Sequence, residues 1–135
     1  MLQKIKTALI SVSDKSNLLP VLKVLKKNNI KIISSGGTYK AIQKLGYSTT
    51  EISIYTGSNE MLDGRVKTLH PKIHAGILYD RANKKHKLEM KKKNFSSIDL
   101  IIVNFYPFQK VVTSTSSAKN IIENIDIGGP TMVRA

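Results

Sequence analysis

Short apolar runs alternate with amphipathic segments through the first 54 residues, and this alternation is the strongest constraint on the fold. The runs at residues 7–12, 31–34 and 49–54 have the length of strands, and the segments between them repeat apolar residues at helical spacing. Strands that are apolar throughout are typical of a parallel sheet covered on both faces. With right-handed connections between the strands, the pattern predicts an α/β domain whose helices cover both faces of the sheet.

The second half of the chain continues the pattern less regularly. Glycines and prolines interrupt residues 55–80, so we expect mostly loop there with a short element at 73–78. The run at 98–103 is the most apolar in the chain and predicts a central strand. A polar spacer at 113–117 leads to an amphipathic helix that starts near Ala118, and a further helix is expected to open around Gly128-Gly129-Pro130.

Length and composition narrow the class of protein. A chain of 135 residues is the size of one domain, and we expect residues 1–135 to form one. The absence of cysteine excludes a disulfide framework, a zinc ribbon and a thiol nucleophile, and it fits a reducing compartment, so we expect a cytoplasmic protein. No run approaches the length of a membrane span, which predicts a soluble chain without a membrane partner.

The formal charge of +13 raises the question of a polyanionic partner. Six lysines lie between residues 84 and 93 with one glutamate, and that segment carries neither arginine nor aromatic side chains. Nucleic-acid surfaces usually add such contacts to their lysines. A solvated lysine-rich helix is therefore the first interpretation, attraction of a small phosphorylated ligand the second, and nucleic-acid binding the third.

Three polar motifs fall at the carboxyl ends of predicted strands, at residues 11–15, 34–38 and 104–106. Ligands of open parallel sheets bind at such ends, so we expect the three motifs to face one crevice. The Ser-Gly-Gly-Thr turn at 35–38 offers backbone N–H groups at a helix start, where a phosphate is favoured, and Lys15 supplies a counter-charge. Taken alone, the turn is more often only a tight turn with a capping residue.

The loop at 63–71 gathers two cations and an imidazole. Arg65 and Lys67 flank Val66, so in extended chain both side chains leave on the same side as a fork and a point charge. The alternative is two solvated cations. His70 and His74 have the spacing of helical metal ligands, but Pro71 lies between them and no third ligand is near, so we expect no metal site.

Tyr106 and Asp126 are two further candidate functional residues, and each also has a purely structural interpretation. Tyr106 follows the predicted strand and precedes Pro107, and its phenol is placed to donate to a ligand oxygen unless it packs in the core. Asp126 precedes a glycine pair at a helix start, where a carboxylate either caps the helix or acts on a ligand.

Together these motifs resemble a known family. The segments SDK at 13–15, SGGT at 35–38, RVKTLHP at 65–71, NFYPF at 104–108 and IDIGGPTMVRA at 125–135 are similar to the inosine monophosphate (IMP) cyclohydrolase domain of bifunctional purine biosynthesis enzymes. The resemblance runs from the first strand to the last residue. It implies a methylglyoxal synthase-like fold, a three-layer α/β/α domain with a parallel sheet.

The resemblance also implies an activity and a site. The family closes the formylated aminoimidazole carboxamide ribonucleotide to IMP with loss of water, needs no metal or cofactor for this step, and is dimeric. Catalysis would fall to Lys67, Tyr106 and Asp126. The purine-pathway ribonucleotide would be held by Ser11, Ser13, Asp14, Lys15, Ser35, Gly36, Gly37, Thr38, Arg65, Val66, Thr68, Val103, Asn104, Ile127, Gly128 and Gly129.

One departure from the family lies at the last residue. The family continues Arg-Ala-Ala-Ala-Lys-Asn, with the lysine as a proton donor and acceptor, whereas this sequence stops at Arg134-Ala135 and has no transformylase half. We therefore expect a C-terminally incomplete domain that is poorly active by itself. The alternatives are a non-catalytic nucleotide- or phosphate-binding regulatory module of the same fold and a methylglyoxal synthase-like lyase.

Overall fold

The computed structural model describes residues 3–115 and 117–135, and its centre is one four-stranded sheet. All neighbouring strands are parallel, in the order β3-β2-β1-β4, and Leu9 lies opposite both Ile33 and Ile101. Every strand therefore ends at the same edge. The strands are β1 (Thr7–Ser11), β2 (Lys31–Ser34), β3 (Thr50–Glu51) and β4 (Leu100–Val103).

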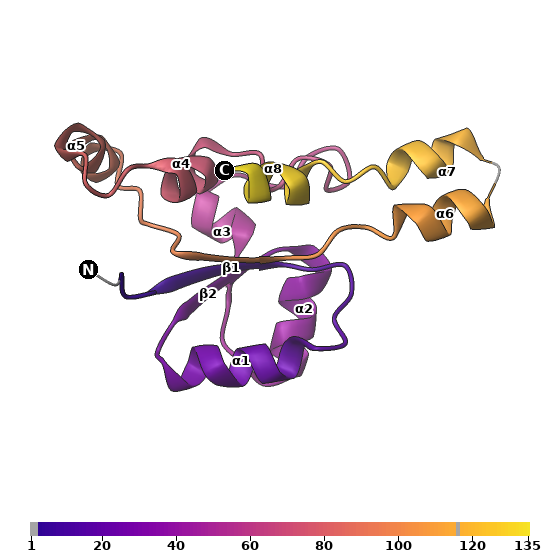
Figure 1. The fold of residues 1–135 in the computed structure, drawn as a ribbon, viewed down its shortest axis with the longest axis horizontal. Coiled ribbons are helices and arrows are strands. Elements are labelled where there is room, and N and C mark those ends of the chain that lie inside the picture. The colour runs from indigo at the N-terminus through magenta and orange to yellow at the C-terminus, as the bar shows by residue number, and fades with distance from the viewer. Residues whose placement is uncertain (1–2, 116) are drawn as a thin grey trace.

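Helices cover both faces of this sheet, which confirms the three-layer α/β prediction (Figure 1). One face carries α1 (Leu18–Lys27) and α2 (Gly36–Lys44), and the other carries α3 (Ile52–Thr56), α4 (Pro71–Leu78) and α8 (Gly128–Arg134). At opposite ends of the molecule lie α5 (Lys84–Lys92) and the pair α6 (Phe108–Ser114) and α7 (Ala118–Glu123).

Side chains of β1 enter two separate cores. Ala8 and Ile10 pack with Leu22 of α1 and Ile42 of α2, whereas Leu9 packs on the other side with Ile73, Met132 and their neighbours. The three β1 side chains are fully buried. Since successive residues of a strand point to opposite faces, a strand buried on both faces must be apolar throughout.

Two strand predictions need correction. The most apolar run does not form a central strand, because β4 lies at the edge of the sheet. Leu100 and Ile102 pack against one core, and Ile101 and Val103 against the other. The apolar run therefore indicates that both faces of β4 are covered by other elements. It does not indicate that β4 has a neighbouring strand on each side.

The predicted strand at 49–54 is shorter than expected. Only Thr50–Glu51 pairs with β2, and the chain then turns into α3. The Glu51 carboxylate accepts a hydrogen bond from the Ser53 N–H at 2.6 Å, which caps this helix, and Gly57 ends it in the left-handed region. A local cap therefore overrides the strand propensity of the isoleucines.

The last third also differs from expectation. The predicted polar spacer at 113–117 overlaps the end of α6, a helix that sequence patterning missed, and Ser116 lies outside the described residues. The expected helix α7 forms, but none of its described side chains is buried. No helix within residues 3–115 and 117–135 combines the length and apolarity needed to cross a bilayer.

Candidate active site

A pocket of about 430 Å³ opens beyond the carboxyl ends of β1, β2 and β4. This is where ligands of open parallel sheets bind. The three polar strand-end motifs do meet there, as expected. The predicted site residues that line the pocket are Ser11, Ser13, Lys15, Ser35, Gly37, Thr38, Arg65, Lys67, Thr68, Asn104, Tyr106, Asp126, Ile127, Gly128 and Gly129.

One side of the pocket, which we name the strand-end wall, consists of residues 11–15, 35–38 and 104. Thr38 ties the first two segments together, because its hydroxyl donates to the Val12 carbonyl at 3.0 Å and accepts from the Val12 N–H at 3.1 Å. The Thr38 side chain is buried, so breaking this pair would leave backbone groups without partners.

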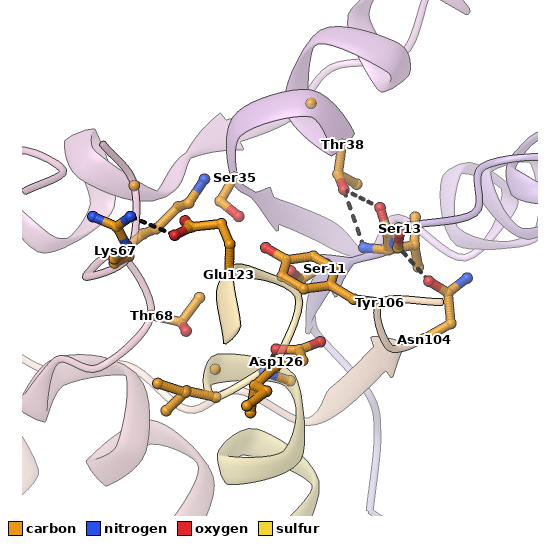
Figure 2. A pocket seen from close by; sticks show the side chains of 18 of the residues that line it. Ser11, Ser13, Ser35, Thr38, Lys67, Thr68, Asn104, Tyr106, Glu123 and Asp126 are labelled. Carbon is orange, nitrogen blue, oxygen red and sulfur yellow. Dashed lines mark hydrogen bonds and ion pairs between the residues drawn. The ribbon is translucent and has the colours of Figure 1, made fainter. Parts of the chain in front are cut away.

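Asn104 joins the third segment to the same wall (Figure 2). Its side-chain oxygen accepts from the N–H groups of Ser13 at 2.6 Å and Asp14 at 3.1 Å, and its amide nitrogen donates to the Asp14 carbonyl at 2.8 Å. A residue at the end of β4 thereby fixes the loop that follows β1, more than 90 positions earlier in the chain.

Donors for an anion gather at the start of α2. The ammonium of Lys15 donates to the Ser13 carbonyl at 3.0 Å, and its stem lies so close to Gly37 that a Cβ there would come within 3.5 Å of Lys15 Cε. Among the described residues Lys15 forms no ion pair. A phosphate at this helix start would meet backbone N–H groups and one unneutralised cation.

Two of the hydroxyls in the pocket belong to buried residues. The residues Ser35 and Thr68 are each only 7% exposed and both line the pocket. Neither hydroxyl makes a hydrogen bond to another residue in the described part of the chain, and Ser35 does not cap α2 with its side chain. Since neither hydroxyl oxygen is among the buried polar atoms without a partner, both are accessible from the pocket and available to a ligand.

The opposite side, which we name the loop wall, consists of residues 60–68 and 122–129. Lys67 Nζ lies 3.6 Å from the Glu60 carboxylate, and a Cβ on Gly64 would come within 2.8 Å of that nitrogen. Gly64 also has a φ of +86°. The turn therefore favours glycine here, whereas the end of the flexible Lys67 side chain could shift to make room.

A second ion pair crosses the loop wall, between Arg65 and Glu123; Figure 2 labels Glu123 and marks with a dashed line the pair that its carboxylate makes. Both side chains are about half exposed, at 53% and 49%. The Glu123 hydrogen bond raises the pKa of the Arg65 guanidinium, and the same bond lowers the pKa of the Glu123 carboxyl. Glu123 was not among the predicted site residues.

The glycine pair lets α8 approach the pocket closely. A Cβ on Gly128 would lie 2.5 Å from the Thr68 hydroxyl oxygen, and one on Gly129 would lie 2.9 Å from the Asp126 carboxylate. The Gly129 N–H donates to Asp126 at 3.1 Å, so the capping alternative for this carboxylate holds for one of its oxygens. Asp126 nevertheless lines the pocket, as does the half-exposed Tyr106.

Four predicted binding residues support the pocket from outside its lining. Asp14 turns its carboxylate to the Ser16 N–H at 2.9 Å, a bond that lowers the pKa of Asp14. Gly36 adjoins the Lys67 ammonium, since a Cβ there would lie 3.1 Å away. The other two are Val66, which bridges to Met61, and Val103, which packs under Gly129.

Of the two histidines considered as metal ligands, His70 takes a structural position. His70 precedes α4 and accepts a hydrogen bond from the Lys72 N–H at 3.1 Å through Nδ1, so it caps the helix that Pro71 opens. No group of three or more metal-ligating side chains occurs among the described residues.

Further lining residues escaped sequence reasoning. Gly64 could have been predicted, because it lies inside the cationic loop at 63–71. Glu123 could not, because it follows the unpredicted helix α6 and reaches the pocket only through the fold. The additional lining residues are Val12, Asp63, Gly64, Ile122, Glu123 and Ile125.

Comparison with known proteins relates this chain to a family. A family model described as "MGS-like domain" matches residues 17–131. The chain is 50% identical over 131 residues to the bifunctional purine biosynthesis protein PurH of Rhodospirillum rubrum, which covers 97% of this chain and 25% of the relative. The PurH protein of Clostridium acetobutylicum is also 50% identical, with 97% of this chain and 26% of the relative covered.

A solved structure has a fold similar to that of this chain. A crystal structure of ForH superposes with a TM-score of 0.81 at 29% identity, covering 96% of this chain and 66% of that one. The chain spans about a quarter of the length of the curated relatives that it matches.

Proposed function

Because the chain belongs to the MGS-like domain family, we propose that it is the IMP cyclohydrolase domain of a bifunctional purine biosynthesis enzyme. In this proposal the pocket binds the formylated aminoimidazole carboxamide ribonucleotide and closes its second ring to give IMP and water. The identity of about half of all aligned residues to PurH proteins supports this assignment over other activities on the same fold.

The observation that carries the proposal is the convergence of three kinds of group on one pocket. Within residues 3–115 and 117–135, Lys15 has no ion-pair partner and the hydroxyls of Ser35 and Thr68 have no hydrogen-bond partner, while Lys67, Tyr106 and Asp126 line the same cavity. The first two kinds suit the phosphate and ribose of a nucleotide, and the third suits proton transfer and charge stabilisation.

Ring closure joins the carboxamide nitrogen of the substrate to its own formyl carbon. The formyl oxygen leaves as water, and its two protons come one from each nitrogen that flanks the new ring carbon. Both reacting groups sit on one molecule, so holding them in the attacking geometry supplies effective molarities on the order of 10⁵ M or more. The protein then has to stabilise the oxyanion and move protons.

We assign these roles by chemistry and position. Lys67 and Tyr106 stabilise the formyl oxygen as it gains charge, since a cation and a phenol are both donors to an oxyanion. Asp126 orients the carboxamide N–H or accepts its proton through the carboxylate oxygen that is not bonded to Gly129. The proposed step requires no metal or cofactor.

A cyclisation assay with the formylated ribonucleotide tests the proposal. It is run on the 135-residue chain and on the chain extended through the lysine that follows in the family, with IMP binding measured on both by calorimetry. We expect IMP binding by both and turnover raised by the extension. Binding without turnover in either form would support a regulatory module instead, and conversion of dihydroxyacetone phosphate would support a methylglyoxal synthase-like lyase.

Two finer features belong to the same proposal, a cytoplasmic location and a homodimer. Support for an association surface comes from exposed apolar side chains on and around α6 and α7, among them Phe105, Phe108, Val112 and Ile122. Sedimentation at several concentrations tests the dimer, and a monomer at micromolar concentration would contradict it.

A further inference from the structure

Helices α6 and α7 (Phe108–Ser114 and Ala118–Glu123), which we name the α6–α7 hairpin, make one side-chain hydrogen bond to a distant segment among the described residues. That bond is the ion pair between Arg65 in the loop wall and Glu123 at the end of α7. No described side chain of either helix is buried, and the hairpin projects from one end of the sheet (Figure 1). The Arg65–Glu123 contact therefore joins an exposed hairpin to the pocket.

Glu123 does not suit the helix that carries it. It is the last residue of α7, where the helix dipole disfavours a carboxylate. Its helical neighbour Lys119 lies four residues before it, which is the weaker order for such a pair. Local helix stability thus gives no reason for an acid at this position, while contact with Arg65 does.

The cations of the pocket differ in their partners. Lys15 forms no ion pair among the described residues, whereas Arg65 is paired with Glu123 and Lys67 lies near Glu60. Glu123 itself lines the pocket and projects among the site residues (Figure 2). Of the pocket cations, the Arg65 guanidinium is the best bidentate donor for an anionic ligand. The Glu123 carboxylate already occupies this guanidinium, so a ligand must compete with it.

We infer that Glu123 is an affinity-determining residue of the site: its carboxylate occupies the Arg65 guanidinium until an oxygen-bearing group of the ligand replaces it. The identity of the ligand rests on the proposed function, but the exchange of one anion for another at Arg65 does not. Since exposed ion pairs are weak, removing the competitor should tighten ligand binding by only about two- to fivefold.

The test compares Glu123→Gln with Glu89→Gln, a control on α5 that makes the same charge change away from this pocket. Calorimetry gives the Kd for IMP. Mass spectrometry gives the rate at which phenylglyoxal modifies Arg65, with Arg134 in the same chain as reference. We expect E123Q to lower the Kd by about two- to fivefold and to speed Arg65 modification, because that reagent attacks guanidines more readily when no carboxylate holds the proton. E89Q should change neither.

The same Glu123 substitution in a variant that lacks Arg65 distinguishes competition for Arg65 from general repulsion between Glu123 and an anionic ligand. If Glu123 acts through Arg65, the tightening by E123Q should vanish in an Arg65→Met background, whereas general repulsion of an anion would survive there. An unchanged or higher Kd in E123Q, or tightening that persists without Arg65, would overturn the inference and leave the proposed function standing.

Absence of IMP binding in every variant would instead contradict the proposed function. Inorganic phosphate then serves as the probe, through its protection of Arg65 against phenylglyoxal. Protection at lower phosphate concentration in E123Q than in the unmodified chain would support the exchange at Arg65, and equal concentrations would overturn it.

Discussion

The two walls of the pocket are built in different ways. The strand-end wall is joined across the sequence by hydrogen bonds between backbone and side chain, two through Thr38 and three through Asn104. The loop wall has local backbone hydrogen bonds at the Met61–Val66 bridge and one at Gly129, and its cationic side chains are held by partly exposed ion pairs, Arg65–Glu123 and Lys67–Glu60. One wall is preformed at the end of a buried sheet, and the other has contacts that a ligand can replace.

This difference suggests a division of work. Hydrogen bonds to backbone in a fixed geometry suit the part of a ligand that anchors it, because no rearrangement is needed on binding. Weak surface ion pairs suit a part of the site where side chains exchange partners when a ligand binds. We therefore expect variants of the strand-end wall to affect folding and binding together, and variants of the loop wall to affect turnover or affinity with little effect on folding.

The largest effect should come from Lys67 in the loop wall. Replacing it by methionine removes the cation that faces the proposed oxyanion, so turnover of the formylated ribonucleotide should fall about 10²- to 10³-fold. IMP binding should remain detectable and the melting temperature nearly unchanged. Lys40→Met, an exposed change on α2 with the same loss of charge, is the control. Turnover of Lys67→Met within about threefold of the unmodified chain would remove Lys67 from the mechanism.

The next largest effect is a loss of stability on changing Asp99, which lies at the amino ends of the strands whose carboxyl ends form the strand-end wall. The Asp99 carboxylate is 3% exposed and accepts from the N–H groups of Lys6 at 2.8 Å and Thr7 at 3.0 Å and from Arg81 at 3.0 Å. Burial pushes the pKa of Asp99 up, but these bonds outweigh it and hold the pKa below its ordinary value. Asp99→Asn should lower the free energy of unfolding by about 2–3 kcal/mol at neutral pH.

The sign of the pH dependence follows from that lowered pKa. The ionised Asp99 stabilises the folded state fully above the pKa of the unfolded chain, about 4, and this contribution is lost as the pH falls through the lower folded pKa. Denaturant titrations between pH 2 and pH 7 should show a steeper acid loss in the unmodified chain than in Asp99→Asn. Parallel curves would show that Asp99 does not tie β1 to β4 in this way.

The same substitution at two threonines, Thr38 in the strand-end wall and Thr68 in the loop wall, compares the two walls directly. Thr38→Val breaks both bonds to Val12 and should cost about 1–2 kcal/mol of stability. Thr68→Val removes a hydroxyl that has no bond to a described residue, so stability should stay within about 0.5 kcal/mol while the Kd for IMP rises. Equal losses of stability in the two variants would contradict the distinction between a fixed wall and an available one.

The smallest effect is expected at Glu60. Its carboxylate lies 3.6 Å from Lys67 Nζ and is 47% exposed, so the pair is weak. Glu60→Gln should change kcat and the Kd for IMP by less than about twofold. A tenfold loss of kcat would mean that Glu60 positions Lys67, and the loop wall would then be more fixed than we describe.

Sequence reasoning reached the strand-end wall better than the loop wall, for a physical reason. A strand that is apolar on both faces and ends at Ser11 or Ser34 carries its own local signal, and parallel topology brings such ends together. The position of β4 at the edge carried no such signal, because its residues are apolar and pack against a core on each face, as those of β1 do, although they are only partly buried.

The loop wall depends on contacts that no local pattern encodes. Glu123 reaches Arg65 across 58 positions of sequence from the end of an exposed helix. The motif RVKTLHP identified the cations, but their partners Glu60 and Glu123 became visible only in the fold. The cap at Glu51, which turns a predicted strand into α3, is a similar case at shorter range.

The most direct test of this account is a crystal structure of the chain with IMP. We predict the phosphate at the start of α2 beside Lys15, Ser35 and Gly37, with Cα shifts of the strand-end wall under about 1 Å. Arg65 should be released from Glu123 and bonded to the nucleotide. A nucleotide bound elsewhere, or one bound here only after the strand-end wall has rearranged, would contradict the account.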